Sequence, residues 1–537
     1  MEKRRVIILS GPIASGKTTL GDKLVDRYGA VRFKTNDLIR ALRPAVRNER
    51  SALQKAGEAL DRSTRGAWVK EALAREVGEL PHDANVVVDS VRTPKQISEI
   101  RKAFGSIVHH IHLTASEEEL AQRYSQRKDK IVELPSYSEV KASRTERIIG
   151  RLERLADIVV YTDQCTDEDV LIRAVALLGL YPRDLSPVVD VIVGGQYGSE
   201  GKGNIAAHIS TEYQYLVRVG GPNAGHKVFG EPVEVYHHLP SGTTRASNAK
   251  LVLGPGAILN VGGLLDEIST FAVTEKRLFI DPQAMVINDE DIEYEKKQLS
   301  KISSTAQGVG AASARKINDR GKIKWGKSQV VLAKDVAELK PFVHESAPIL
   351  EQAYQKHEKI LLEGTQGTSL SLHHGTYPYV TSRDTTVSGC LADAGISPKR
   401  VRRIVMVCRT YPIRVGGPSG PMSQGREIFA EDIARRSKLS LEEIESTEIT
   451  TTTGRPRRFA EFDWSQLRKS TMLNGATDIA LTFVDYLDQH NQKARRFEQL
   501  KLATINFIEE VERVSGVPVS LISTRFDYRN IIDRRAW

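Results

Sequence analysis

The sequence is poor in cysteine: its 537 residues contain only Cys165, Cys390 and Cys408. The spacing of the three matches no metal-binding motif, and an odd number cannot pair completely as disulfides. This scarcity excludes a disulfide-stapled secreted scaffold. We therefore expect a protein of the reducing cytoplasm.

Long apolar runs are also missing. No stretch approaches the roughly 20 consecutive apolar residues that span a membrane. The charged N-terminus runs straight into a short apolar segment and a glycine-rich loop, which is unlike a signal peptide. The formal net charge of +9 is a mild excess for this length. The composition predicts neither a membrane partner nor a nucleic-acid partner, and it suits small phosphate-bearing substrates.

Two segments begin in the same way, with a short β-branched strand, a glycine-rich turn and a helical pattern. The first starts at Val6 and the second at Val188. Short apolar runs of this kind are typical of parallel strands that are buried on both faces. We predict an α/β protein of two domains, 1–182 and 188–537, each with a mostly parallel sheet flanked by helices. The boundary is expected in the proline-bracketed stretch 181–187.

The first loop, residues 11–18, fits the phosphate-binding pattern G-x-x-x-x-G-K-[ST]. Backbone N–H groups of such a loop and the following helix N-terminus bind phosphate oxygens. Lys17 would reach the β- and γ-phosphates, and Thr18 would hold Mg²⁺ together with Asp89, unless Asp89 is a plain strand-end aspartate. The expected phosphate-binding residues are Gly11, Ser15, Gly16, Lys17 and Thr18.

Residues 1 to about 180 resemble the small nucleotide-kinase branch of P-loop proteins. The resemblance implies ATP binding and phosphorylation of a (deoxy)nucleoside monophosphate, which it does not identify. Asp37 and Arg40 are candidates for contacting the acceptor, and Arg123 and Arg127 for a basic lid. Solvated surface positions are the alternative for both pairs. Such a domain can also bind nucleotide only to regulate its neighbour.

The second domain carries several motifs in one order. They are the glycine loops 196–203 and 221–226, His-His-Leu-Pro-Ser-Gly at 237–242, Glu-Gly-Thr-Gln-Gly at 363–367 and Thr-Thr-Thr-Gly-Arg-Pro-Arg-Arg at 451–458. With these motifs, residues 188–537 resemble the adenylosuccinate synthetases, and their length is closer to the compact archaeal and phage members. The resemblance implies transfer of a γ-phosphoryl group to O6 of a 6-oxopurine nucleotide, and displacement of that phosphate by L-aspartate.

The resemblance also assigns residues to tasks. His226 is the expected general acid. Thr453, Arg455 and Arg457 are expected to bind aspartate, because planar guanidinium groups grip carboxylates bidentately. Gly225 would offer its carbonyl to Mg²⁺. The further catalytic residues are Ser199, Lys202 and Gln366, and the nucleotide-binding residues are Gly198, Glu200, Gly201, Gly203, Asn223, Thr305, Thr381, Asp485 and Ser523.

In this family an arginine of a second subunit completes the acceptor pocket, so the resemblance implies a homodimer. The corresponding stretch is 316–320. Strict spacing puts Asp319 at the position of that arginine, and Arg320 follows one residue later.

Three departures from the family concern the choice of substrates. Ser199 stands where the usual enzymes have an aspartate that takes the N1 proton and helps bind Mg²⁺. In having a serine at this position, the sequence resembles phage enzymes that act on (d)GMP. We therefore favour GMP or dGMP over IMP as acceptor. At the expected base pocket of the donor, Phe483 replaces a lysine and Arg525-Phe526 replace a glycine-proline pair. These two changes make ATP or dATP plausible beside GTP.

Two other functions are compatible with the sequence. One is a nucleotide kinase whose synthetase-like domain only senses purine nucleotides. The other is an effector, for example one that alters nucleotide pools against phage. The presence of Lys202, His226, Arg455 and Arg457 favours a working ligase.

Overall fold

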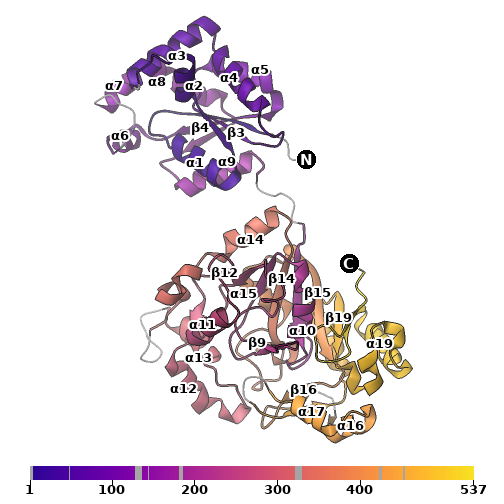
Figure 1. Ribbon diagram of the computed structural model, residues 1–537. Helices are drawn as coiled ribbons and strands as arrows, with labels where there is room; N and C mark the ends of the chain where they lie inside the picture. Colours follow the sequence, from indigo (N-terminus) through magenta and orange to yellow (C-terminus); the bar gives the residue numbers. More distant parts are fainter. Residues whose placement is uncertain are drawn as a thin grey trace. The chain divides into compact units, whose positions relative to one another are not determined.

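The computed structural model describes residues 4–47, 49–126, 136–142, 144–180, 186–320, 329–422, 426–450 and 454–536. The chain divides into two compact units, Met1–Arg183 (unit 1) and Asp184–Trp537 (unit 2). Each unit is built on a mostly parallel sheet with helices around it, which confirms the predicted fold class (Figure 1). Among the described residues, every helix is too short or too polar to cross a bilayer.

Unit 1 contains a five-stranded sheet in the order β2-β3-β1-β4-β5, and all neighbouring strands are parallel. The strands are β1 (Val6–Ser10), β2 (Val31–Lys34), β3 (Val86–Asp89), β4 (Val108–Thr114) and β5 (Ile158–Tyr161). The helices are α1 (Lys17–Tyr28), α2 (Thr35–Leu42), α3 (Arg50–Thr64), α4 (Ala67–Gly78), α5 (Pro94–Phe104), α6 (Glu117–Ser125), α7 (Tyr137–Ala142), α8 (Arg144–Ile149) and α9 (Asp167–Leu177).

The apolar side chains of β1 pack into two hydrophobic clusters. Val6 and Ile8 belong to one hydrophobic cluster, and Ile7 and Leu9 belong to another. Side chains alternate between the faces of a strand, so a strand covered on both faces must be apolar at every position. This explains why the strand reads as a continuous apolar run.

Unit 2 contains a nine-stranded sheet in the order β12-β10-β7-β14-β6-β15-β19-β20-β21, parallel throughout except for the edge strand β21. Its strands are β6 (Val189–Gly194), β7 (Tyr215–Arg218), β10 (Lys250–Leu253), β12 (Leu278–Ile280), β14 (Ile360–Gly367), β15 (Val401–Arg409), β19 (Asp478–Thr482), β20 (Val519–Ser523) and β21 (Ile531–Asp533).

Smaller elements surround this sheet. Short strands form β8 (His226–Val228) with β9 (Glu234–Tyr236), β11 (Ile258–Leu259) with β13 (Met285–Val286), and β16 (Ile413–Val415) with β18 (Arg457–Ala460) and β17 (Glu427–Ile428). The α-helices are α10 (Lys202–Ile209), α11 (Val261–Thr270), α12 (Asp289–Gln298), α13 (Val309–Asn318), α14 (Ser346–Gln355), α15 (Val387–Ala394), α16 (Ala430–Ser437), α17 (Leu441–Thr447), α18 (Trp464–Asn474) and α19 (Leu502–Ser515).

The parallel arrangement collects functional segments at one edge of the unit 2 sheet. Five adjacent strands, β7, β14, β6, β15 and β19, end there, and Arg218, Arg409 and Thr482 are the last residues of β7, β15 and β19. The first glycine loop follows β6, and the Glu-Gly-Thr-Gln-Gly motif forms the end of β14. In open parallel sheets, ligands bind outside the carboxyl ends of the strands. This edge is therefore the place to look for a site.

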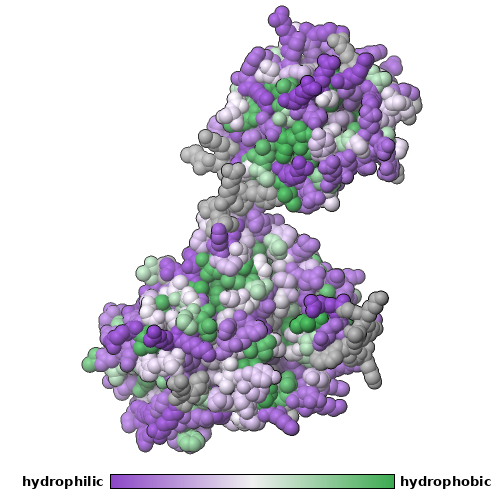
Figure 2. Space-filling view, turned by 180° about the vertical axis from the view of Figure 1, so that it is seen from behind, coloured by the Kyte–Doolittle hydropathy of each residue, from purple (hydrophilic) through white to green (hydrophobic). Residues whose placement is uncertain are grey.

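The surface of each unit is mostly hydrophilic on the face seen in Figure 2, with smaller hydrophobic areas among the hydrophilic side chains. The cysteines are free: Cys390 and Cys408 are buried in unit 2, and Cys165 is half-buried in unit 1.

Because the hydrophobic clusters of the two units do not share residues, we expect the units to be destabilised independently. Leu73 in unit 1 and Leu264 in unit 2 are both fully buried. Leu73→Ala should lower the stability of unit 1 by about 2–5 kcal/mol through the cavity that it leaves, and Leu264→Ala should do the same to unit 2. Calorimetric unfolding of the full chain should show each variant shifting a different transition. A single transition that both variants shift equally would contradict separate cores.

Candidate active site

A cavity of about 300 Å³ lies in unit 2 and is lined by the loops at the carboxyl edge of its sheet. Most of the residues singled out in the sequence meet in it. They are Gly198, Ser199, Gly201, Lys202, Gly203, Asn223, Gly225, His226, Thr305, Gln366, Thr381 and Arg457. Side chains from the two glycine loops, from β14 and from β18 thus face one space.

Four further candidates do not line this cavity. Glu200, Asp485 and Ser523 are buried behind its wall, and Arg455 is exposed. Thr453 lies outside the described residues. Of the three residues expected to hold aspartate, Arg457 is the one that the structure brings to the cavity.

The buried Glu200 carboxylate stabilises the first glycine loop by accepting hydrogen bonds from its backbone. Its Oε1 accepts from the backbone N–H groups of Gln196 (3.1 Å) and Gly198 (2.8 Å), and its Oε2 pairs with Lys202 Nζ at 2.7 Å. A Cβ at Gly367 would lie 2.4 Å from both Glu200 Oε1 and Gln196 O. The glycine of the β14 motif is therefore required for the close packing of this loop, and Glu200 shapes the loop without lining the cavity.

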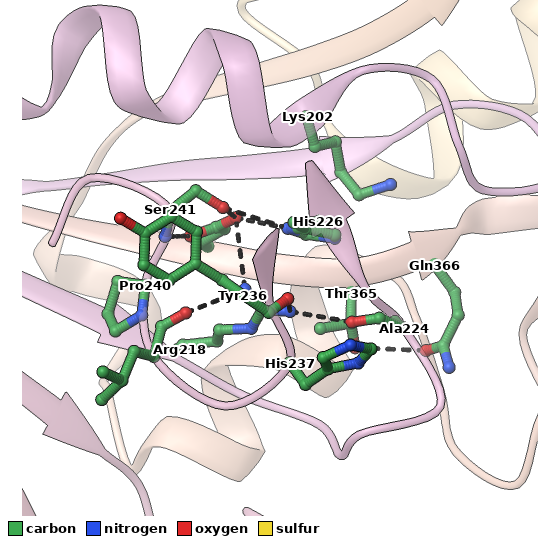
Figure 3. Close-up of polar contacts among 12 residues, drawn as sticks. Lys202, Arg218, Ala224, His226, Tyr236, His237, Pro240, Ser241, Thr365 and Gln366 are labelled. Carbon is green, nitrogen blue, oxygen red and sulfur yellow. Dashed lines mark hydrogen bonds and ion pairs between the residues drawn. The ribbon is translucent and has the colours of Figure 1, made fainter. Parts of the chain in front are cut away.

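His226 is held by a buried carboxylate. Its Nδ1 lies 2.5 Å from Glu363 Oε1, and the other oxygen of Glu363 accepts from Ser241 N at 2.8 Å. Arg218 Nη1 lies 3.8 Å from the same carboxylate and donates to Leu239 O at 3.0 Å. Figure 3 shows Arg218, His226 and Ser241 converging on this point.

The protonation of this pair follows from its surroundings. Burial alone would raise the pKa of Glu363, but His226, Arg218 and Ser241 together lower it to about 2. Burial and the nearby Arg218 lower the pKa of His226 to about 4 against the opposing effect of Glu363. Glu363 is thus ionised and accepts the Nδ1 proton of His226. This fixes the imidazole tautomer and leaves Nε2 for a ligand in the cavity.

A second group of polar side chains lies at another part of the cavity: Asn223, Gln366 and Thr381 line it, and Thr365 and Arg383 lie outside the lining. Asn223 Nδ2 donates to Thr381 Oγ1 at 3.4 Å, and Asn223 Oδ1 is buried with no hydrogen-bond partner within the described parts of the chain. Thr365 Oγ1 donates to Gln366 Oε1 at 3.1 Å and accepts from Arg383 Nη1 at 2.8 Å. These amides and hydroxyls are suited to a phosphate or a sugar.

Arg457 and Ser199 are neighbours in the cavity wall. Arg457 Nη2 donates to Ser199 Oγ at 3.4 Å, and Arg457 Nη1 donates to the buried Glu448 Oε2 at 2.9 Å. The serine hydroxyl therefore occupies a position within reach of a guanidinium group. An aspartate there would form an ion pair with Arg457.

Aromatic rings form a further wall. Phe229, Phe483 and Phe526 all line the cavity, and the centroid of the Phe526 ring lies 5.2 Å from that of Phe229 and 5.1 Å from that of Phe483. The guanidinium carbon of Arg409 lies 3.6 Å from the Phe483 centroid. Asp485 is fully buried, and Gln492 Nε2 donates to its Oδ2 at 3.4 Å. Burial raises the pKa of this carboxyl to about 7.

The cavity wall does not fit a Mg²⁺ ion held by protein carboxylates. Among the described lining residues Glu295 is the one acid, and its oxygens accept from the backbone N–H groups of Gly308, Gly310 and Ala311. Protein-bound Mg²⁺ usually takes one or two carboxylates plus substrate phosphates. Ser199 and the Gly225 carbonyl are neutral. The described lining residues therefore do not form a Mg²⁺ site of their own.

The phosphate loop of unit 1 lies between β1 and α1, as predicted. Lys17 Nζ donates to Gly11 O (2.9 Å), Pro12 O (2.6 Å) and Ser15 Oγ (3.2 Å), so its ammonium group lies over the loop. Thr18 is exposed, and Gly16 precedes α1 as its N-cap. Asp89 is paired with Arg32. The P-loop residues fit a nucleotide phosphate with Mg²⁺ on Thr18, while Asp89 already has a cationic partner.

The other unit 1 candidates are less informative. Asp37 is exposed, Arg40 is half-buried, and the two pair with each other at 2.6 Å. Arg123 donates to Glu119 and Thr162, and Arg127 lies outside the described residues.

Sequence reasoning missed several residues that shape the unit 2 site. Glu363 stands in a motif that was recognised, but it was given no task. Arg218 ends an apolar strand, and a buried cation at that point has no local signature. Glu448 lies in an ordinary polar stretch just before residues 451–458, which we call the arginine loop, and Phe229 is an isolated aromatic residue. Neither position carries a sequence pattern that reveals its contacts.

Family models match both units of the chain. Residues 191–329 and 327–492 match the family model of adenylosuccinate synthetase, and residues 6–155 match that of an AAA domain. The adenylosuccinate synthetase of Methanocaldococcus jannaschii is 37% identical over 358 residues, which cover 64% of this chain and 96% of that protein. The Archaeoglobus fulgidus enzyme is 37% identical over 353 residues, or 64% and 98% of the two chains.

Two solved structures resemble unit 2. Fully ligated adenylosuccinate synthetase from Plasmodium falciparum has a TM-score of 0.56 at 23% identity, covering 65% of this chain and all of that one; it supports the fold alone. Succinoaminodeoxyadenylate synthetase of cyanophage S-2L, bound to dGMP and to dATP as an energy donor, has a TM-score of 0.54 at 27% identity, covering 65% and 96%.

The buried Asp485 predicts a pH dependence. Burial raises the pKa of its carboxyl to about 7 in the folded chain, whereas its ordinary value is 3.8. The folded state then binds more protons than the unfolded state between these values, so its stability falls as the pH rises from about 4 to 7. Relative to Asp485→Asn, the wild type should lose about 1.4 kcal/mol per pH unit across this window.

Urea unfolding of both proteins between pH 5 and 8 measures this difference. Asp488→Asn is the control, because the pKa of Asp488 is lowered and does not lie in this window. A difference between wild type and Asp485→Asn that stays constant from pH 5 to 7 would show that Asp485 is already ionised.

Proposed function

Because the chain belongs to the adenylosuccinate synthetase family, we propose that unit 2 joins L-aspartate to C6 of a 6-oxopurine (deoxy)nucleotide, with GMP or dGMP as the preferred acceptor. Unit 2 is a ligase of the adenylosuccinate synthetase type. The observation that carries the proposal is the single cavity in which Ser199, Lys202, His226, Gln366 and Arg457 meet.

The proposed reaction has two steps. The purine O6 attacks the γ-phosphorus of a nucleoside triphosphate, the bond to the β-phosphate oxygen breaks, and a nucleoside diphosphate leaves. The amine of aspartate then attacks C6, and the C6–O6 bond breaks with phosphate as the leaving group. Phosphoryl transfer depends mainly on positioning and on stabilising negative charge. Lys202 and residues of the first glycine loop line the cavity and are assigned to the phosphates.

His226 is assigned to the developing charge at O6. Its Nε2 is available because Glu363 accepts the Nδ1 proton. With a pKa of about 4, the ring is neutral at pH 7 before a substrate binds. The negative charge of a triphosphate beside it would raise that pKa and favour the imidazolium, which then donates to O6 or to the transferring phosphoryl group. Arg457 is assigned to a carboxylate of aspartate.

Ser199 supports a guanylate acceptor. The Ser199 hydroxyl is uncharged, so it does not neutralise the side of the Arg457 guanidinium that faces the cavity. The same hydroxyl oxygen can accept a hydrogen bond from a purine N1–H or 2-amino group. The cyanophage structure, bound to dGMP, supports the same choice of acceptor. IMP remains the competing acceptor.

The aromatic wall supports ATP or dATP as donor. Phe483 and Phe526 offer ring faces and edges, which stack on any purine. Asp485, expected from the resemblance to bind the nucleotide, is fully buried and does not line the cavity. dATP is described as the energy donor in the cyanophage structure. Mg²⁺ is proposed to be required, held mainly through the phosphates of its nucleotides.

We propose for unit 1, a P-loop kinase-like domain, the transfer of phosphate from Mg·ATP to a (deoxy)nucleoside monophosphate. The geometry of Lys17 and the loop supports binding of ATP phosphates. The two units would then act on related nucleotides of the cytoplasm. A homodimer is proposed from the family resemblance, with the end of α13 and Arg320 as the region to examine.

The substrate proposal is tested by incubating the full chain with aspartate, Mg²⁺ and each pairing of ATP, dATP or GTP with IMP, dIMP, GMP or dGMP. Mass spectrometry should detect the succinyl-purine product, with the highest rate for a guanylate and an adenine nucleotide. Lys17→Ala should keep this product and lose any nucleoside diphosphate made from the monophosphate. If no pairing gives a succinyl product, unit 2 is a sensor and not a ligase.

The acceptor choice is tested by Ser199→Asp. The new carboxylate would pair with Arg457, so we expect the aspartate KM to rise about tenfold, as for other charge-assisted contacts. The same variant should lose rate with dGMP more than with IMP. Ser199→Ala, which adds no charge, should keep the guanylate preference. A Ser199→Asp enzyme with unchanged preference would show that another residue selects the acceptor.

A further inference from the structure

Glu448 lies behind the cavity, where two parts of its wall meet. The carboxylate is almost completely buried and has three side-chain partners, Arg409, Arg457 and Tyr486. Its Oε2 accepts from Arg457 Nη1 at 2.9 Å and from Arg409 Nη1 at 3.3 Å, and its Oε1 accepts from Arg409 Nη2 and from the Tyr486 hydroxyl at 2.8 Å. Both oxygens of this carboxylate are thus used, and one of the partners, Arg457, lines the cavity.

The first part of the wall is the arginine loop. Glu448 holds Arg457 twice, because its backbone carbonyl also accepts from Arg457 N at 3.1 Å. With Nη1 bound to the carboxylate, Nη2 faces the cavity beside Ser199. A guanidinium group is a rigid planar fork, so a bond at one nitrogen sets the direction of the other. The position of Glu448 therefore sets the direction in which Arg457 Nη2 points.

The second part is the aromatic wall. Arg409 is fully buried, its guanidinium carbon lies 3.6 Å from the centroid of the Phe483 ring, and its Nη1 also donates to Ser199 O at 3.3 Å. A cation over a ring face both packs the ring and attracts it electrostatically. Glu448 therefore also fixes the ring that lines the cavity, through Arg409.

The charges fit this arrangement. Burial alone would raise the pKa of Glu448, but Arg409 and Arg457 outweigh it and lower the pKa below its usual value. One carboxylate against two guanidinium groups leaves a net positive charge in the wall. That charge suits an anionic ligand, and it would leave Arg457 repelled by Arg409 if Glu448 lost its charge.

We propose that Glu448 is a positioning residue that couples the binding of aspartate to the binding of the donor base. It orients Arg457 toward a carboxylate of aspartate and, through Arg409, holds Phe483 against the donor purine. This inference rests on the proposed function, since it assigns Arg457 to aspartate and Phe483 to the donor. Glu448 itself touches neither substrate.

The test compares Glu448→Gln with Asp190→Asn in the full chain. Asp190 is an equally buried carboxylate that pairs with Arg402 and Tyr213 at the start of β6 and does not line the cavity. Glu448→Gln should raise the aspartate KM about tenfold and the donor KM about threefold, the size expected for loss of a charge-assisted hydrogen bond, with kcat lowered less. The acceptor KM should stay within about twofold, and Asp190→Asn should leave all three KM values unchanged. Glu448→Asp, which keeps the charge, should recover part of the aspartate KM.

The outcomes separate this inference from the proposed function. If the wild type makes no succinyl product, the proposed function fails. If the wild type is active and Glu448→Gln lowers kcat with unchanged KM values for aspartate and donor, Glu448 is only structural and the inference is overturned. Should Glu448→Gln not fold, Tyr486→Phe removes one donor to the same carboxylate and keeps its charge. A raised aspartate KM in that variant supports the coupling, and an unchanged one overturns it.

Discussion

The ionised carboxylate of Glu363, buried at the end of β14, is the interaction on which the arrangement of the cavity depends. A buried charge is tolerated only when it is paired and hydrogen-bonded. Glu363 meets this condition because it contacts His226, the Ser241 backbone N–H and the nearby Arg218, which belong to three separate segments. The second glycine loop, β8 and the segment that follows β9 are thereby held against the end of the sheet.

Two other buried carboxylates near the cavity are paired with basic side chains in the same way. Glu200 holds the first glycine loop and Lys202, and Glu448 holds Arg409 and Arg457. In each case the acid lies outside the cavity lining, while Lys202, Arg457 or His226 lines the space. These three side chains offer hydrogen-bond donors to the cavity, which suits an anionic ligand.

The sequence was most informative where chemistry demands fixed local patterns. Apolar runs such as Val6–Leu9 predict parallel strands because both faces are covered, and glycine loops mark phosphate sites because backbone N–H groups must approach closely. Pairings between distant segments have no such signature. Nothing near Glu448 indicates that it meets Arg409, and the spacing of Thr482–Asp485 cannot tell that Phe483 faces the cavity while Asp485 is buried. Arg455 and Arg457 differ by two residues, yet only Arg457 lines the cavity, because the direction of a side chain depends on the path of the loop.

The central claim is that O6 of the acceptor purine becomes the leaving group after phosphorylation. It is tested most directly with dGMP that carries ¹⁸O at C6, incubated with the full chain, aspartate, Mg²⁺ and ATP. The account predicts that each succinyl product formed is matched by one inorganic phosphate that contains a single ¹⁸O, as read by mass spectrometry. Phosphate without ¹⁸O, with the label released into water or retained on the purine, would contradict it.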